Sequence, residues 1–191
     1  MPVKTISGFK SVLSGGGARA NQFAVVMNWP GAVSNHGTIT TPSAEDSSFL
    51  ISATNLPGMT IGEVAVPFRG RNLYLAGDRT FEAWTITVLN DINFTLRNAF
   101  EVWMDHINSM SNNTGEEDPL SYQVDASVSQ LDKAGGYVKT YNFEGLWPTT
   151  LSNIDVSAET NDAIETFEVT LRYDYFEAAT GDSLPGTGIT T

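Results

Sequence analysis

The segment from Leu56 to Asn90 constrains the fold most strongly, because turn signals divide it into short runs of strand-forming residues. We expect these strands at 62–68, 72–76 and 80–89, separated by the triplets Arg-Gly-Arg and Gly-Asp-Arg. In the last run Trp84 and its alternate neighbours are apolar, whereas Thr85 and Thr87 lie between them. Since side chains of a strand alternate between two faces, one face suits a core and the other face needs a different partner.

Five further runs have the composition of strands. They lie at 21–29, 49–55, 122–130, 137–147 and 165–176. The last has the clearest alternation, with Phe167 and Val169 on one face and Glu168 and Thr170 on the other. We expect Pro148 to end the fourth run, and residues 31–47 to form a polar loop.

One segment, at about 91–110, predicts a helix. Its apolar residues recur at three- and four-residue spacing and form one stripe: Leu96, Phe100, Trp103, Ile107 and Met110. Asp91 or Asn93 can cap the N-terminus of this helix. Gly115 follows in a position suited to ending it.

Charge and composition exclude several classes of protein. The chain has a net charge of −12, which divides into +1 for residues 1–90 and −13 for residues 91–191. Nucleic-acid binding through phosphates needs a basic patch, so a conventional DNA or RNA binder is not expected. The chain has no cysteine, no apolar run of membrane-spanning length and no apolar segment typical of a secretory signal near its start.

No pattern predicts a catalytic, cofactor or metal site. His36 lies alone in a polar loop and His106 lies beside the apolar helix stripe, without a nucleophile in a known catalytic pattern. The glycines after Ser14 are not followed by the Gly-Lys-Ser/Thr of a phosphate-binding loop. A glycoside hydrolase would need two carboxylates at a defined separation, and no pair stands out. We therefore expect no enzyme and no cofactor.

The expected fold is mainly β, with two packed antiparallel sheets or a small β-barrel and one flanking helix. The expected organisation is a flexible N-terminal arm at 1–20, a single domain at 21–177 and a mobile C-terminal tail at 178–191. The arm contains the hinge Ser14–Gly17.

Six motifs, taken in order, are similar to a known family. The chain resembles the tail tube proteins of contractile-tailed bacteriophages, which are related to the tube protein of type VI secretion. The motifs are ATNLPG (53–58), VPFRGR (66–71), AGDRTFEAWTITVLND (76–91), LRNAFEVWMDHIN (96–108), FEGLWPTTLSNID (143–155) and ETFEVTLRYDYFE (165–177).

The resemblance implies a structural subunit of a phage tail tube. In this family strands join between six subunits into a continuous ring barrel, and rings stack into a hollow tube inside a contractile sheath. The implied partners are other copies of the chain, the sheath, the baseplate and the tape-measure protein. DNA passes through the channel on its way into the host without specific binding. The implied location is the virion tail, after synthesis in the host cytoplasm, with no membrane anchor.

The polar faces of the two clearest strands then become candidates for the channel wall. The lumen-lining candidates are Thr85, Thr87, Glu168, Thr170 and Asp174. The candidates for subunit interfaces, through acidic groups of a neighbouring subunit, are Arg69, Arg71 and Arg79. Alternatively these faces meet solvent or the sheath, and the arginines are solvated turn charges. Two other functions stay open, a type VI secretion tube and a sugar-binding or adhesin-like sandwich with Trp84, Trp103 and Trp147 as stacking residues.

Overall fold

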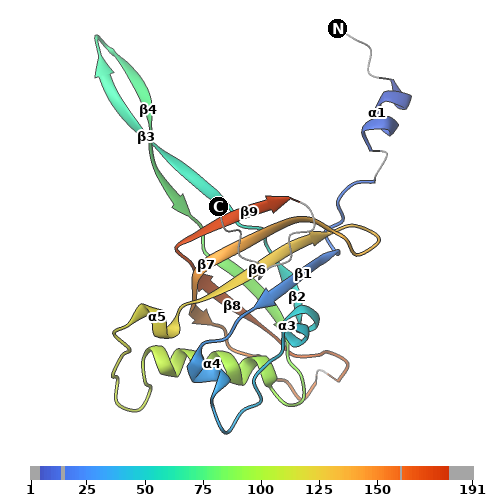
Figure 1. Cartoon of the computed structure of the whole chain (residues 1–191), viewed down its shortest axis with the longest axis vertical. Helices are drawn as coiled ribbons and strands as arrows, with labels where there is room; N and C mark the ends of the chain where they lie inside the picture. The colour runs from blue at the N-terminus through green and yellow to red at the C-terminus, as the bar shows by residue number, and fades with distance from the viewer. Residues whose placement is uncertain (1–4, 14–15, 160, 181–191) are drawn as a thin grey trace.

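A seven-stranded antiparallel sheet, folded over on itself, forms the body of the protein (Figure 1). The computed structural model describes residues 5–13, 16–159 and 161–180. The strands of this sheet are β1 (Phe23–Met27), β2 (Ile51–Thr54), β5 (Trp84–Leu89), β6 (Val124–Leu131), β7 (Tyr137–Leu151), β8 (Thr166–Arg172) and β9 (Tyr175–Thr180). Their order is β1–β6–β7–β8–β5–β2, with β9 paired to β7.

The long strand β7 joins two layers of this sheet. Its first part pairs with β6 and β9, whereas residues from Trp147 to Leu151 pair with β8. The strand therefore continues through Pro148, and the expectation that it ends there is wrong. Pro148 has no N–H to donate and lies where the register with β8 shifts, a position that a strand tolerates. The expected pair of packed sheets is confirmed, and among the described strands no pairing of β1 with β2 closes a barrel.

The run expected as one strand at 165–176 is divided into β8 and β9. Phe167, Val169 and Leu171 face the core as expected, but the chain crosses to the other layer after Tyr173. At this corner the Asp174 N–H donates to the Glu144 carbonyl. Gly145, with a φ of 68°, leaves room for the Asp174 carboxylate, because a Cβ there would lie 2.5 Å from Oδ2.

Aromatic side chains fill the space between the layers. Trp84 of β5 stacks on Phe143 of β7 with ring centroids 4.4 Å apart, and both side chains are fully buried. The Trp84 Nε1–H donates to the Asn55 carbonyl at 3.0 Å, so its polar atom is satisfied. The expected alternation is thus confirmed for β5, where Trp84, Ile86 and Val88 are buried.

Helix α4 (Thr95–Ile107) covers one end of the core, as the stripe predicts (Figure 1). Leu96, Phe100 and Trp103 are buried, whereas Met110 lies beyond the helix and is 82% exposed, so including it in the stripe was wrong. In the described part of the chain four short helices accompany it: α1 (Ile6–Val12), α2 (Gly31–Ser34), α3 (Ala44–Leu50) and α5 (Pro119–Tyr122). None of the described helices is long and apolar enough to cross a membrane.

The expected loop at 31–47 contains α2 and most of α3, so it is corrected, whereas the strand expected at 49–55 is confirmed as β2, which begins at Ile51 after α3 ends. Helix α3 begins with a capping box, in which the Ser43 side chain accepts from the Asp46 N–H and the Asp46 carboxylate accepts from the Ser43 N–H. In the N-terminal arm, α1 has no buried residue, and Ser14 and Gly15 of the expected hinge lie outside the described residues. Of the expected tail, 178–180 belong to β9 and 181–191 lie outside the described residues. The domain division stays a prediction.

Asp91, the first of the two expected caps, holds the start of α4. Phe94, directly before the helix, has a left-handed φ of 54° and makes no side-chain cap. Instead the Asp91 carboxylate accepts from the Thr95 N–H and Thr95 hydroxyl at 2.7 Å each, and from the Asn93 N–H at 3.3 Å. Burial alone would raise the pKa of Asp91, but these hydrogen bonds outweigh it and lower the pKa below 3.8.

Replacement of Asp91 by alanine should lower the free energy of unfolding by about 1 kcal/mol at neutral pH. Because the folded-state pKa is lowered, the stabilisation is present above the ordinary pKa of 3.8 and is lost as pH falls through the lowered value. The difference between the two proteins should therefore shrink in acid. Urea unfolding at several pH values measures this, with Asn93→Ala as the control. Equal losses for the two variants would contradict the assigned cap.

Candidate assembly surfaces

A separate two-stranded hairpin projects from the body (Figure 1). It consists of β3 (Met59–Phe68) and β4 (Arg71–Phe81), which contact chiefly each other. The expected turn at Arg69-Gly70 is confirmed, with left-handed φ angles of 47° and 82°. The expected turn at 77–79 is wrong, because β4 continues through it and the chain breaks only between Phe81 and Trp84.

Glycines explain why Gly77-Asp78 resembles a turn without being one. The register of the hairpin shifts between Ile61 and Glu63. A Cβ at Gly77 would lie 3.1 Å from the backbone C and O atoms of Gly62, so the two strands approach closely there. Gly77 therefore serves a close backbone approach at a bulge rather than a reversal of the chain.

Beyond this bulge the two faces of the hairpin differ. Residues directly opposite each other share a face, and one face carries large apolar side chains that are 39–65% exposed: Val64, Val66, Phe68, Leu73 and Leu75. We call this the apolar hairpin face. The opposite face carries Glu63, Ala65 and Tyr74 among others. Isolated two-stranded ribbons are marginally stable in water, so an exposed apolar face of this size indicates a protein partner.

The three candidate arginines lie on this hairpin. Arg69 is in the turn, where its guanidinium carbon lies 5.5 Å from the centre of the Phe68 ring. Arg71 pairs with Phe68 and therefore lies at the tip of the apolar hairpin face, whereas Arg79 pairs with Ile61 below the bulge. Among the described residues none of the three forms an ion pair within the chain. Their interface role stays a prediction.

Four of the five lumen candidates lie together on one ladder. Thr85 pairs directly with Thr170, and Thr87 pairs with Glu168, on the face of β5 and β8 away from the core. The three threonines are half-buried and Glu168 is exposed. Asp174 is not part of this ladder, because it follows β8 at the corner to β9. Arg172 is exposed two positions after Thr170 and adds a positive charge to this surface.

Sequence inspection missed a group of carboxylates on the outer surface of β6, β7 and β9. We call Asp125, Glu144 and Glu177 the carboxylate surface. Tyr175 pairs directly with Glu144, and Glu177 pairs with Asn142 next to it. Burial is the largest cause of a raised pKa for Glu144. The charge of Asp125, a hydrogen bond with Asp125 and the charge of Glu177 raise this pKa further. The charge of Glu144 is likewise the main cause of a raised pKa for the Tyr175 hydroxyl.

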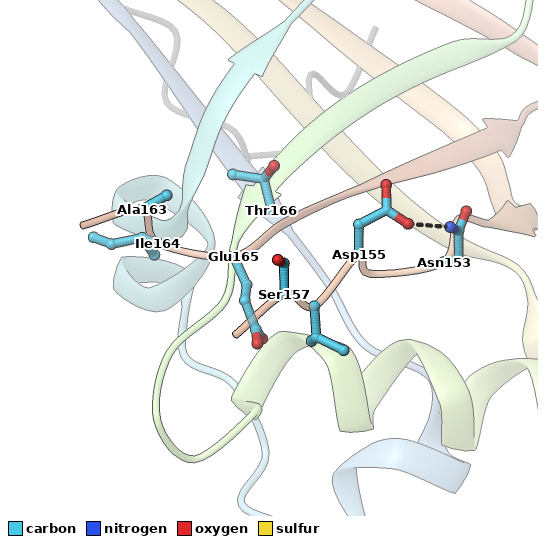
Figure 2. A pocket seen from close by; sticks show the side chains of 8 residues that line it. Asn153, Asp155, Ser157, Ala163, Ile164, Glu165 and Thr166 are labelled. Carbon is cyan, nitrogen blue, oxygen red and sulfur yellow. Dashed lines mark hydrogen bonds between the residues drawn. The ribbon is translucent and has the colours of Figure 1, made fainter. Parts of the chain in front are cut away.

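A pocket of about 290 Å³ lies at the end of the body near α4 (Figure 2). It is formed by the segments 153–157 and 163–166, and the Asn153 side chain donates to the Asp155 carboxylate at 2.9 Å. Its lining contains carboxylates and hydroxyls but no histidine or lysine that could activate a nucleophile. Among the described residues no group of three or more acidic or histidine side chains could hold a metal ion. The pocket therefore suggests no reaction.

The tryptophans proposed for sugar stacking are not available on the surface. Trp84 and Trp103 are completely buried, and the Trp103 Nε1–H donates to the Tyr122 carbonyl at 2.8 Å. Trp147 is only half-buried, but one partly exposed ring is not a stacking platform. The adhesin-like alternative loses the feature that suggested it.

Comparison with known proteins agrees with the resemblance seen in the sequence motifs. A family model described as phage tail tube protein matches residues 18–179. The tail tube protein of Serratia phage KSP90 is 31% identical over 171 residues, covering 88% of this chain and 94% of that protein. The tail tube protein gp19 of Enterobacteria phage T4 is 33% identical over 165 residues, covering 86% and 93%.

Solved structures support the same fold at lower sequence identity. A chain of the anti-feeding prophage tube-terminating cap is 16% identical with a TM-score of 0.62, covering 86% of this chain and 92% of that chain. A chain of the PVC sheath–tube complex is 18% identical with a TM-score of 0.56, covering 93% and 99%. By sequence similarity along most of its length, the chain belongs to the phage tail tube protein family and is a structural component of the virion tail.

Proposed function

We propose that this subunit polymerises into rings of six, which stack into the hollow tube of a contractile tail. The observation that supports this most directly is the projecting hairpin, whose apolar face no other element of the described chain covers. In a self-assembling subunit, a second copy of the chain can cover this apolar face. Strands β1 and β2 end the sheet path and offer unpaired edges to neighbours, and closing them into a ring would also prevent uncontrolled edge pairing.

The ladder of Thr85, Thr87, Glu168 and Thr170 is our candidate for the channel wall. The threonine side chains of this ladder carry no charge. Six copies of Glu168 would form a ring of negative charge, and six copies of Arg172, four residues further along the chain, would add a separate ring of positive charge. The ring of negative charge repels DNA over a distance of about 10 Å at physiological salt. Asp174, which lies away from this ladder, is a weaker candidate for the wall.

Replacement of Glu168 by lysine should slow DNA release, because six cations per ring would attract phosphates instead of repelling them. We expect complete virions with normal tail length but incomplete or delayed ejection, measured as DNA released after addition of receptor. Glu117→Lys, a charge reversal in the loop after α4, is the control. Normal ejection from tails built of Glu168→Lys subunits would remove this ladder from the wall.

The further partners we propose are the sheath, the baseplate, the tape-measure protein during assembly and DNA during infection. The solved neighbours come from a prophage baseplate and a sheath–tube complex, which supports the first two. The role we propose is purely structural, without catalysis.

Electron microscopy of the purified chain tests the proposal. Negative-stain images should show six-fold rings or hollow tubes, either on concentration or after addition of baseplates that nucleate growth. Tubes of uniform width with six-fold rotational averages are the expected result. Monomers that persist at high concentration with baseplates present would overturn the proposal.

A further inference from the structure

The tip of the hairpin is a cationic feature on an acidic protein. Between Val64 and Gly77 the hairpin contains Arg69 and Arg71 and no acidic residue, whereas residues 91–191 have a net charge of −13. Strand β3 has 10 residues, so the tip extends about 33 Å from its base. The hairpin of β3 and β4 projects away from the sheet that contains β6, β7 and β9, so its tip lies apart from these strands of its own chain (Figure 1).

The carboxylate surface has the complementary chemistry. Asp125 and Glu177 are exposed, Glu144 is half-buried, and among the described residues none of the three forms an ion pair. The burial of Glu144, and after it the repulsion from Asp125 and Glu177, disfavour the charged state and raise the pKa of Glu144. A positive charge from outside the chain would relieve this repulsion.

Two buried polar atoms in the same part of the sheet lack partners. Ser127 is 3% exposed, and its Oγ makes no hydrogen bond. The Oδ1 atom of Asn142 is also buried and also makes no hydrogen bond. Ser127 pairs with Asn142, and Asn142 pairs with Glu177, so the three lie in one row across β6, β7 and β9 on the face of the carboxylate surface. Unpaired buried polar atoms are costly, so this row is a place in the sheet whose hydrogen bonds the described chain does not complete.

An arginine matches this site better than a metal ion or a lysine. A guanidinium carries five donors, binds carboxylates through two parallel hydrogen bonds and stacks on aromatic rings. Tyr175, 47% exposed and directly opposite Glu144, offers such a ring at the edge of the carboxylates. On the hairpin, Arg71 shares a face with Phe68 and Leu73, so one docking event would cover apolar surface as well as pair charges.

We propose that the hairpin tip of one copy, with Arg71 as its main contact and Arg69 beside it, binds the carboxylate surface of a neighbouring copy. This inference rests on the proposed polymerisation and names the two surfaces that meet. The contact is heterologous, since each copy offers both a tip and a receptor, and such contacts propagate into rings or stacks.

A charge exchange tests the pairing. Arg71→Glu and Glu177→Arg should each raise the protein concentration needed for baseplate-nucleated polymerisation by at least about tenfold, because a like charge then meets the partner. The chain with both changes should recover part of the wild-type behaviour, since the reversed charge at position 71 again meets an opposite charge at position 177. Circular dichroism of each soluble variant shows whether it is folded. Lys133→Glu and Glu117→Arg are matched reversals outside the two surfaces and should leave polymerisation unchanged.

The outcomes separate this pairing from the proposed function. Normal polymerisation of either single variant would overturn the pairing, and so would failure of the double variant to recover. In either case tubes formed by the wild-type chain would leave the proposed tube function in place. A wild-type chain that forms no tubes at all would overturn both. Recovery that occurs only when the two changes are combined supports the contact, because a second charge reversal on a different element cannot repair a loss of fold.

Discussion

A chain that lacks the distal hairpin should fold normally and form no tubes. The variant replaces residues 63–76 with a short Asn-Gly turn between Gly62 and Gly77, where the two strands already approach closely. The core is unaffected, because it consists of residues of the folded sheet, α4 and their connections, and its fully buried residues include none from β3 or β4. The apolar hairpin face and the tip arginines disappear together, so the expected loss of polymerisation is complete.

Circular dichroism and thermal unfolding measure the fold of this variant, and electron microscopy with baseplates measures assembly. A finer pair of variants identifies the face responsible. Val66→Ser with Leu73→Ser changes one directly opposed pair on the apolar hairpin face, and Ala65→Ser with Tyr74→Ser changes the pair on the other face. We expect the first to weaken polymerisation more. Tubes formed by the hairpin-deleted chain would show that other surfaces suffice for assembly.

Much of the body could be predicted from the sequence because its signals are local. Alternation in β5 and β8 reports burial of every second residue, and the α4 stripe reports burial of one helix face. The turn at Arg69-Gly70 could be predicted because glycine is favoured where the backbone of a turn takes a left-handed conformation. Four lumen candidates lie on one ladder because the alternation in both strands indicates which residues face away from the core.

The errors occur where pairing with distant strands decides the structure. Pro148 normally ends a strand, but β8 accommodates it at a register shift. Gly77-Asp78 has the composition of a turn, and only the partner strand shows that Gly77 permits a close approach to Gly62. The run at 165–176 alternates throughout, yet a corner after Tyr173 depends on Gly145 in another strand.

The carboxylate surface could not be found from the sequence for the same reason. Glu144 and Glu177 are 33 positions apart, and neither stands in a motif with Asp125. Their proximity follows from the registers of β7 with β6 and with β9, which no local pattern encodes. The tip arginines stand out in the sequence of an acidic chain, whereas the surface that we propose as their acceptor is visible only in the folded sheet.

Replacement of Trp84 by alanine should lower the free energy of unfolding far more than replacement of Asp91 does. The Trp84 side chain is fully buried, stacks on Phe143 at 4.4 Å and donates a hydrogen bond to the Asn55 carbonyl. Truncation of a buried tryptophan costs about 3–5 kcal/mol through lost burial and the cavity left behind. Since domains of this size are stable by roughly 5–15 kcal/mol, much of the native stability would disappear.

Trp147→Ala provides the matched control, because this tryptophan is only half-buried and makes one edge contact, with Tyr122 at 6.2 Å. Urea unfolding should show a clearly smaller loss for Trp147→Ala than for Trp84→Ala. Equal losses for the two variants would mean that the stack between the layers does not dominate the core.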